Sequence, residues 1–316
     1  MNSATAHPPL TVVRAADIQM PQQTPTLWLI EHLWGNSAVG VIGGSPKCGK
    51  SWLALELAVA VASGRPCLGH FAVPAAGPVL LYAAEDTPLQ VRHRIEQLCQ
   101  ARGAPFETLE LRLILEPTLR IDRAADIDRL RTTLARQHYR LLILDPYVRL
   151  QAADENNATE VAAILATLRE LSRSFSLALL LVHHARKSPG DVAGQALRGS
   201  SDFHAWGDCN LYLRRRSYEL LLTVEHRAAA APPPLTLVLA HDPLRLEIVR
   251  HADDPSAADP SLEQRLLGAL AKGPAHLEQL RAAVAARKQS VTRALHTLEE
   301  TGRVVRHAHG WQLRRD

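Results

Sequence analysis

The sequence has 316 residues, of which 47% are hydrophobic and 22% charged, with a formal net charge of +4. This length favours two domains, the apolar content excludes a wholly disordered chain, and the absence of a long apolar run or a leader pattern argues against a membrane partner and secretion. The four cysteines are scattered without a CxxC pair, which speaks against a zinc ribbon and favours a reducing cytoplasm.

The predicted elements begin after a mobile arm. Residues 1–24 are rich in Pro, Ala, Gln and Thr and lack periodicity. Short apolar runs then alternate with helical patterns. We predict strands at 38–42, 79–84, 111–115, 141–144 and 177–182, and helices at 50–63, 89–102, 124–137 and 157–174. Unbroken apolar strands separated by helices indicate an α/β fold with a mostly parallel sheet covered on both faces.

Later apolar segments lie too close together for crossover helices. They fall at 210–213, 219–225, 235–239 and 245–249, and we predict antiparallel strands that extend the sheet. Residues 25–250 would form this domain. An Asp-, Pro- and Ala-rich linker follows at 251–260.

Helical periodicity returns in residues 261–316. Apolar positions predict helices at 262–270, 277–284 and 291–298, and a short hairpin follows at 303–305 and 310–313. Three helices and a hairpin are typical of a winged helix-turn-helix domain.

A glycine-rich motif lies between the first predicted strand and helix. It matches GxxxxGK[ST] with the residues Gly44, Ser45, Pro46, Lys47, Cys48, Gly49, Lys50 and Ser51. In this context the backbone amides cradle phosphates, Lys50 neutralises the β- and γ-phosphates, and the Ser51 hydroxyl binds Mg²⁺. The sequence therefore predicts ATP and Mg²⁺ as cofactors; a glycine loop without a ligand is the alternative.

Two carboxylates follow predicted strands. Asp145 ends an apolar strand and would hold the Mg²⁺, although such a residue can also be a turn or cap residue. Glu85 follows the strand after the first helix and would orient or deprotonate the attacking water. The adjacent Asp86 is the competitor, or a helix N-cap before Thr87.

The ordered set of these motifs resembles the plasmid RepA-type replicative helicases, which are RecA-like P-loop ATPases. The resemblance covers about residues 25–250 and rests on 44–51, 84–86, 144–145, 182–187 and 198–201. It implies a RecA-type core in a ring-forming, ATP-driven DNA translocase, with a hexamer as the expected assembly. It also implies that Glu85 is the catalytic glutamate and that His184 senses the γ-phosphate.

The resemblance further implies two loops that face a central pore, near 149–159 and 186–201. They would contact single-stranded DNA through Arg149, Arg186, Lys187 and Arg198. Related ring helicases carry a Lys-Asn-Arg element where this chain has Glu225-His226-Arg227. Arg227 is therefore the candidate arginine finger for a neighbouring subunit, with Arg198 and Arg214 as alternatives.

The predicted C-terminal domain is basic. Residues 260–316 carry ten Lys or Arg against five Asp or Glu, a net charge of +5, while the rest of the chain has a net charge of −1. In a winged helix the third helix enters the major groove. Duplex contact would involve Lys288, Gln289, Ser290, Thr292 and Arg293. A solvated charged face or a protein-docking role is the alternative.

These expectations combine into a DNA-binding, Mg-ATP-hydrolysing motor. It would be a ring-forming helicase or translocase of a mobile element or replication system. An ATP-gated, DNA-bound regulatory or loader ATPase is the alternative. A recombinase is less favoured, because no N-terminal polymerisation motif is recognisable in the first 24 residues.

Overall fold

The computed structural model describes most of the chain. It covers residues 12–17, 27–151, 158–184, 201–216, 218–250, 262–271, 273–284, 288–300, 302–307 and 310–314. The chain divides into two compact units, Met1–Val249 and Arg250–Asp316. The predicted linker and most of the predicted arm lie outside the described residues. In the part of the chain that is described, every helix is too short or too polar to cross a lipid bilayer.

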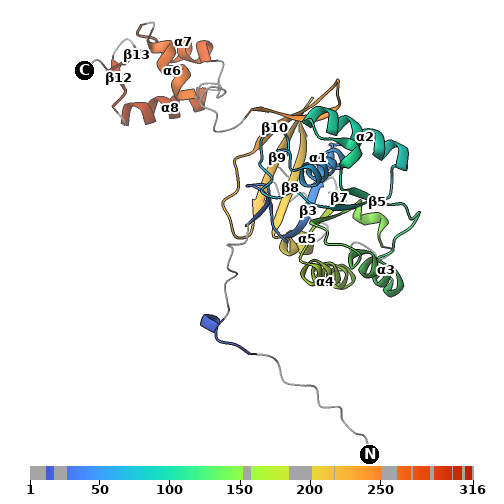
Figure 1. The fold of residues 1–316 in the computed structure, drawn as a ribbon. Coiled ribbons are helices and arrows are strands. Elements are labelled where there is room, and N and C mark those ends of the chain that lie inside the picture. Colours follow the sequence, from blue (N-terminus) through green and yellow to red (C-terminus); the bar gives the residue numbers. More distant parts are fainter. Residues whose placement is uncertain are drawn as a thin grey trace, which may run out of the picture. The chain divides into compact units, whose positions relative to one another are not determined.

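A large sheet forms the centre of the first unit (Figure 1). Its nine strands have the order β11-β10-β9-β8-β3-β7-β6-β4-β5. They are β3 (Val39–Gly44), β4 (Val79–Ala83), β5 (Leu111–Ile114), β6 (Leu141–Asp145), β7 (Ala178–His184), β8 (Cys209–Arg216), β9 (Glu219–His226), β10 (Leu235–Ala240) and β11 (Arg245–Arg250). The strands from β8 to β5 pair in parallel, and β8–β9 and β9–β10 pair antiparallel.

The parallel sheet with an antiparallel extension is confirmed, with one correction. The segment around 210–213 was expected to be antiparallel, but β8 runs parallel to β3 and only the pairing of β8 with β9 is antiparallel. Because β7 and β8 both run parallel to β3, they point in the same direction, and α5 (Ser201–Trp206), a helix that was not predicted, precedes β8.

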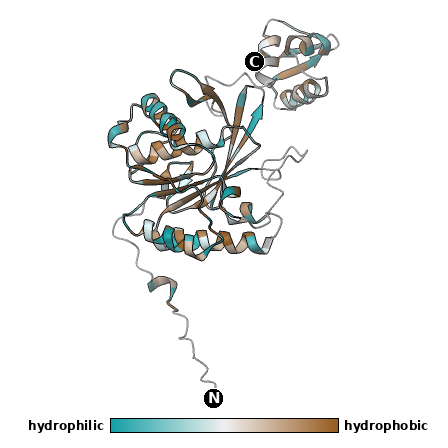
Figure 2. Cartoon of the chain, turned by 90° about the vertical axis from the view of Figure 1, so that its right-hand side faces the viewer, coloured by the Kyte–Doolittle hydropathy of each residue, from teal (hydrophilic) through white to brown (hydrophobic). Residues whose placement is uncertain are grey.

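Helices cover both faces of the sheet (Figure 1). One face carries α1 (Lys50–Ser63) and α2 (Pro88–Arg102), and the other carries α3 (Ala124–Leu134), α4 (Ala158–Phe175) and α5. Shorter elements are η1 (Ala15–Asp17), β1 (Trp28–Ile30), β2 (Trp34–Gly35), η2 (Phe106–Thr108) and η3 (Tyr147–Arg149). Figure 2 shows hydrophobic residues along the strands and hydrophilic ones on the outer sides of the helices.

Each central strand contributes side chains to the hydrophobic cores on both faces of the sheet, which explains its unbroken apolar sequence. In β6, Leu141 and Ile143 pack toward α1 and α2, while Leu142 and Leu144 pack toward α3 and α4. Side chains alternate between the faces of a strand, so a strand covered on both faces needs apolar residues at every position.

A buried ion pair joins α1 and α2 to the edge of the sheet. The Arg102 guanidinium donates through Nη2 to Glu56 Oε1 at 2.6 Å and to the Leu246 carbonyl oxygen at 2.7 Å. Its Nε donates to Glu56 Oε2 at 3.1 Å. Glu56 is fully buried on α1, so this pair fixes three elements at one point.

The second unit has its own core. It contains α6 (Leu262–Leu270), α7 (Leu277–Val284), α8 (Lys288–Glu300) and the antiparallel pair β12 (Val304–His307) and β13 (Gly310–Leu313). Leu266, Leu280, Leu295 and Trp311 are buried together. The three predicted helices and the hairpin of a winged helix are therefore present.

Candidate active site

The glycine-rich loop connects β3 to α1 through an unusual backbone path. A Cβ atom on Gly44 would lie 2.4 Å from the Leu213 carbonyl oxygen of β8, so only glycine fits there. Lys47 and Gly49 have φ values of 62° and 87°, a region that favours glycine. The loop therefore turns over the start of α1, where the first amide groups lack intrahelical partners and attract anions.

The Lys50 ammonium group lies under this loop. It is 4% exposed, and its Nζ donates to the carbonyl oxygens of Gly44 at 3.0 Å and Ser45 at 2.8 Å. Burial lowers the pKa of Lys50. A cation held this close to the loop is placed to neutralise phosphate oxygens bound by the loop amides.

Ser51 and Asp145 meet beside the loop. Asp145 is the last residue of β6, and a hydrogen bond joins its carboxyl group to the Ser51 side chain. Burial raises the pKa of Asp145 to about 6, and the hydrogen bond with Ser51 opposes this shift. A hydroxyl and a carboxylate are oxygen ligands of the kind that Mg²⁺ prefers. These two residues therefore fit a Mg²⁺ ion next to bound phosphates.

The two adjacent carboxylates after β4 have different partners. Arg94 of α2 binds Asp86 through two hydrogen bonds of 2.5 and 3.0 Å. Glu85 accepts one hydrogen bond of 3.1 Å from Arg149 Nε. The cap of α2 is Thr87, which accepts a hydrogen bond from the Gln90 amide. The alternative that Asp86 caps this helix is therefore wrong.

The two histidines that end β7 face opposite sides of the sheet. His183 is buried and stacks on Phe203 of α5, with 4.4 Å between the ring centroids. His184 pairs in register with Gly44 and lines the cavity of the loop. Burial lowers the pKa of His184, and the charge of Lys50 lowers it further. A neutral imidazole there could exchange a hydrogen bond with a bound phosphate.

These groups share one cavity of about 350 Å³. It lies at the carboxyl ends of the parallel strands, where ligands of open α/β sheets bind. Its lining includes Lys47, Gly49, Lys50, Ser51, Trp52, Glu85, Asp86, Arg94, Asp145, His184 and Arg215. The structure thus brings together the predicted loop, metal ligands, base and sensor.

Arg215 belongs to this cavity but was not predicted. Its Nη2 donates to the Lys47 carbonyl oxygen at 2.9 Å. The parallel register pairs Leu213 with Gly44, which places Arg215 beside the loop. The sequence does show three consecutive arginines at the end of β8. They could be placed beside the glycine-rich loop only once β8 was known to pair with β3.

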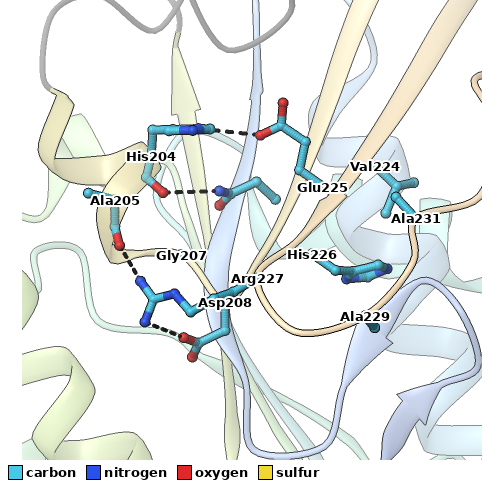
Figure 3. Close-up of a pocket in the computed structure, with 11 residues that line it drawn as sticks. His204, Ala205, Gly207, Asp208, Val224, Glu225, His226, Arg227, Ala229 and Ala231 are labelled. Carbon is cyan, nitrogen blue, oxygen red and sulfur yellow. Dashed lines mark hydrogen bonds and ion pairs between the residues drawn. The ribbon is translucent and has the colours of Figure 1, made fainter.

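Arg227 lies away from this cavity. It follows β9, which runs antiparallel to β8, and therefore lies near the beginning of β3 instead of its end. It forms an ion pair of 3.2 Å with Asp208 and donates to the Ala205 carbonyl oxygen (Figure 3). These residues line a second cavity of about 640 Å³ together with His204 and Glu225. Arg227 is thus not brought to the loop of its own chain.

The residues predicted to contact DNA are described only in part. Arg186, Lys187 and Arg198 lie outside the described residues. In the second unit, Lys288, Gln289, Ser290, Thr292 and Arg293 form the first turns of α8. Thr292 is half-buried, and the side chains of the other four are outside the described part.

Comparisons with known proteins agree with this architecture. A family model for the AAA domain matches residues 4–190, and one for the DprA winged helix domain matches residues 250–310. The fold resembles the ATPase domain of G40P with a TM-score of 0.53 and 12% identity, covering 68% of this chain and 86% of that one.

A second solved structure is described as that of a DnaB-like replicative helicase and its interactions with primase. The TM-score is 0.50 at 13% identity, with 65% of this chain and 56% of that chain covered. The chain thus spans just over half the length of that helicase. The predicted α/β fold with a C-terminal winged helix is confirmed, and at these identities the likeness to solved structures extends to the fold alone.

Proposed function

Because this chain belongs to the AAA domain family, we propose that it is a Mg-ATP-hydrolysing motor of the ring-forming helicase or translocase kind, which acts on DNA in a mobile element or replication system. One observation carries the proposal. The cavity beside the glycine-rich loop gathers five groups from four separate segments: a buried lysine, a serine–aspartate pair, a glutamate and a histidine. This is the set of groups that phosphoryl transfer to water requires.

Each group has a role in this proposal. The amides of residues 44–51 and the Lys50 ammonium group bind the phosphates, and Ser51 and Asp145 hold Mg²⁺. When bound, Mg²⁺ neutralises charge that develops on the phosphates. Glu85 orients and deprotonates the attacking water. His184 contacts the γ-phosphate from the end of β7.

The catalytic assignment of Glu85 over Asp86 is supported by their partners. Both oxygens of Asp86 are engaged by Arg94, and the Arg94 guanidinium lies 5.6 Å from the Trp52 ring centroid. Glu85 has one hydrogen bond from an exposed arginine. The carboxylate of Glu85 is therefore the one that is able to turn toward a water molecule.

The proposal extends to assembly and DNA. We infer a hexameric ring in which Arg227 reaches the ATP of a neighbouring subunit. Single-stranded DNA in the pore would contact Arg149, Arg186, Lys187 and Arg198. Duplex DNA would contact Lys288, Gln289, Ser290, Thr292 and Arg293 of the winged helix, with 25–250 and 261–316 as the two domains. The match to the DprA winged helix domain supports the duplex contact.

A second function, an ATP-gated DNA-bound regulatory or loader ATPase, is favoured by the C-terminal unit. A domain with its own core and a winged-helix match suits the recognition of a fixed site. Such a protein would hydrolyse ATP slowly and without regard to DNA.

ATP hydrolysis by the wild type, Glu85→Gln and Glu110→Gln tests the proposal, without DNA, with single-stranded DNA and with duplex. We expect DNA to stimulate the wild type, and Glu85→Gln to lower kcat about 10²- to 10⁴-fold while ATP binding persists. Glu110 is an exposed carboxylate outside the cavity and serves as the control. A slow rate of ATP hydrolysis that is the same with and without DNA would favour the regulatory ATPase instead.

A further inference from the structure

The two carboxylates after β4 are held with very different strength. Asp86 and Arg94 are each 26% exposed, and two hydrogen bonds join them. Glu85 and Arg149 are 45% and 62% exposed, and one hydrogen bond of 3.1 Å joins them. A paired, half-buried contact is stable, whereas an exposed single ion pair contributes about 1 kcal/mol or less. The Glu85 contact is therefore the one that a competing ligand can break.

The Arg149 side chain connects two functional regions. It lies in η3, four residues after Asp145 and at the start of the segment that leads to α4. Its Nε contacts Glu85 Oε1, while most of the side chain is open to solvent. Under the proposed function, this same arginine contacts single-stranded DNA. The Glu85 carboxylate holds Arg149 Nε and offsets the positive charge of the guanidinium group, and it thereby weakens the attraction of that group for a DNA phosphate.

We propose that Arg149 is a positioning residue that restrains Glu85 until DNA draws it away. In the absence of DNA, the hydrogen bond occupies Glu85 Oε1 and fixes the carboxylate toward η3, away from the attacking water. A DNA phosphate that binds Arg149 releases the carboxylate to accept the proton of that water. The inference rests on the proposed function and supplies a mechanism for stimulation by single-stranded DNA.

Competition for Arg149 has a reciprocal consequence. If DNA weakens the Glu85–Arg149 pair, the pair must weaken DNA binding by the same factor. Removing the charge of Glu85 then frees Arg149 and tightens the binding of single-stranded DNA. This effect appears without ATP, so it is measured apart from catalysis.

The test measures the affinity of the nucleotide-free full-length chain for a labelled oligothymidine by fluorescence anisotropy at low salt. The variants are Glu85→Gln, Arg149→Gln and the double variant. Glu110→Gln and Arg112→Gln are the controls, because they break a similarly exposed ion pair of 2.9 Å at the amino-terminal end of β5, outside the cavity. They also correct for the general effect of charge on DNA affinity.

We expect Glu85→Gln to tighten binding about two- to fivefold beyond Glu110→Gln, the range that an exposed ion pair allows. The gain should vanish when Arg149→Gln is also present. Basal ATP hydrolysis should rise two- to fivefold in Arg149→Gln while its stimulation by DNA shrinks.

Other outcomes separate the two proposals. Equal affinities of Glu85→Gln and Glu110→Gln, or a gain that persists without Arg149, would overturn the restraint and leave the proposed function standing. Failure of the wild type to bind single-stranded DNA would overturn the proposed function and this inference with it.

Discussion

The Asp145 carboxyl group, which we propose as a Mg²⁺ ligand, lies in surroundings that disfavour its charge. Burial raises its pKa from 3.8 to about 6, so the folded chain holds the ionised form less favourably than the unfolded chain does. Ionisation is nevertheless needed for a carboxylate to bind Mg²⁺. A carboxyl group whose ionised form is disfavoured by burial is consistent with the proposed role of Asp145 as a Mg²⁺ ligand.

We therefore predict that Asp145→Asn stabilises the protein while it abolishes Mg²⁺-dependent hydrolysis. The folded pKa lies above the unfolded one, so the contribution of Asp145 to the free energy of unfolding falls as pH rises from about 4 to 6 and is constant above that. The advantage of the variant should grow over the same interval, to about 1–3 kcal/mol. Chemical denaturation in chelator across this pH range measures it. A variant less stable than the wild type at pH 8 would contradict the assignment of the pKa.

At the scale of single residues, the sequence predicted those site residues that belong to a local motif. The loop from Gly44 to Ser51 and the strand ends at Glu85 and Asp145 follow from local patterns. The partners of these groups do not, since Arg149 lies 64 residues from Glu85 and Arg215 lies 168 residues from Lys47. Such contacts depend on which strands become neighbours.

At the scale of elements, α1 and α2 are anchored to the sheet by the Glu56–Arg102 pair. Glu56 is 1% exposed and Arg102 is 11% exposed on their side chains. Burial raises the pKa of Glu56, and Arg102 opposes this shift. Removal of one partner of a buried pair leaves an uncompensated charge, which is more costly than removal of both.

Arg102→Ala should consequently lower the free energy of unfolding by about 3–5 kcal/mol. The double variant Glu56→Gln, Arg102→Ala should lose less than the single one, because no charge is then buried alone. Arg112→Ala, which breaks an exposed pair, should cost less than about 1 kcal/mol. Urea denaturation compares the three. An equal loss for Arg102→Ala and Arg112→Ala would show that the buried pair is not an anchor.

The sequence predicted elements well where they are buried in the core, because burial requires a clear hydrophobic pattern. The helix predicted at 50–63 has the observed bounds, and the central strands differ by one or two residues at their ends. The strands β1 and β2 were not predicted, since three and two residues are too few to show alternation. The six residues of α5 are likewise too short for a helical period, and its absence from the prediction led to the wrong orientation for β8.

At the scale of the whole molecule, two units carry separate cores. The charge is also divided, because residues 260–316 have a net charge of +5 and the remainder −1. Under the proposed function, affinity for duplex DNA and the chemistry of ATP belong to different parts of one chain. Substitutions should affect them separately.

Lys288→Ala and Arg293→Ala should weaken duplex binding by the full chain and leave hydrolysis without DNA unchanged. Each lost phosphate contact should reduce the slope of log K against log salt by about one. Arg65→Ala, an exposed arginine of the first unit, is the matched control. A salt series by anisotropy gives the slopes. Unchanged slopes would contradict a DNA-binding role of the winged helix and favour a role in protein docking.

The position of Arg227 has a consequence for how defects combine. It lies at the strand ends opposite to the loop of its own chain, so under the proposed assembly each catalytic centre is shared by two copies. A subunit that lacks Lys50 would still supply Arg227 to the ATP site of one neighbour. A subunit that lacks Arg227 would still have an intact loop, to which its other neighbour supplies an arginine. Mixtures of the two inactive variants should then regain activity through complementation at those interfaces where an intact loop meets an intact arginine.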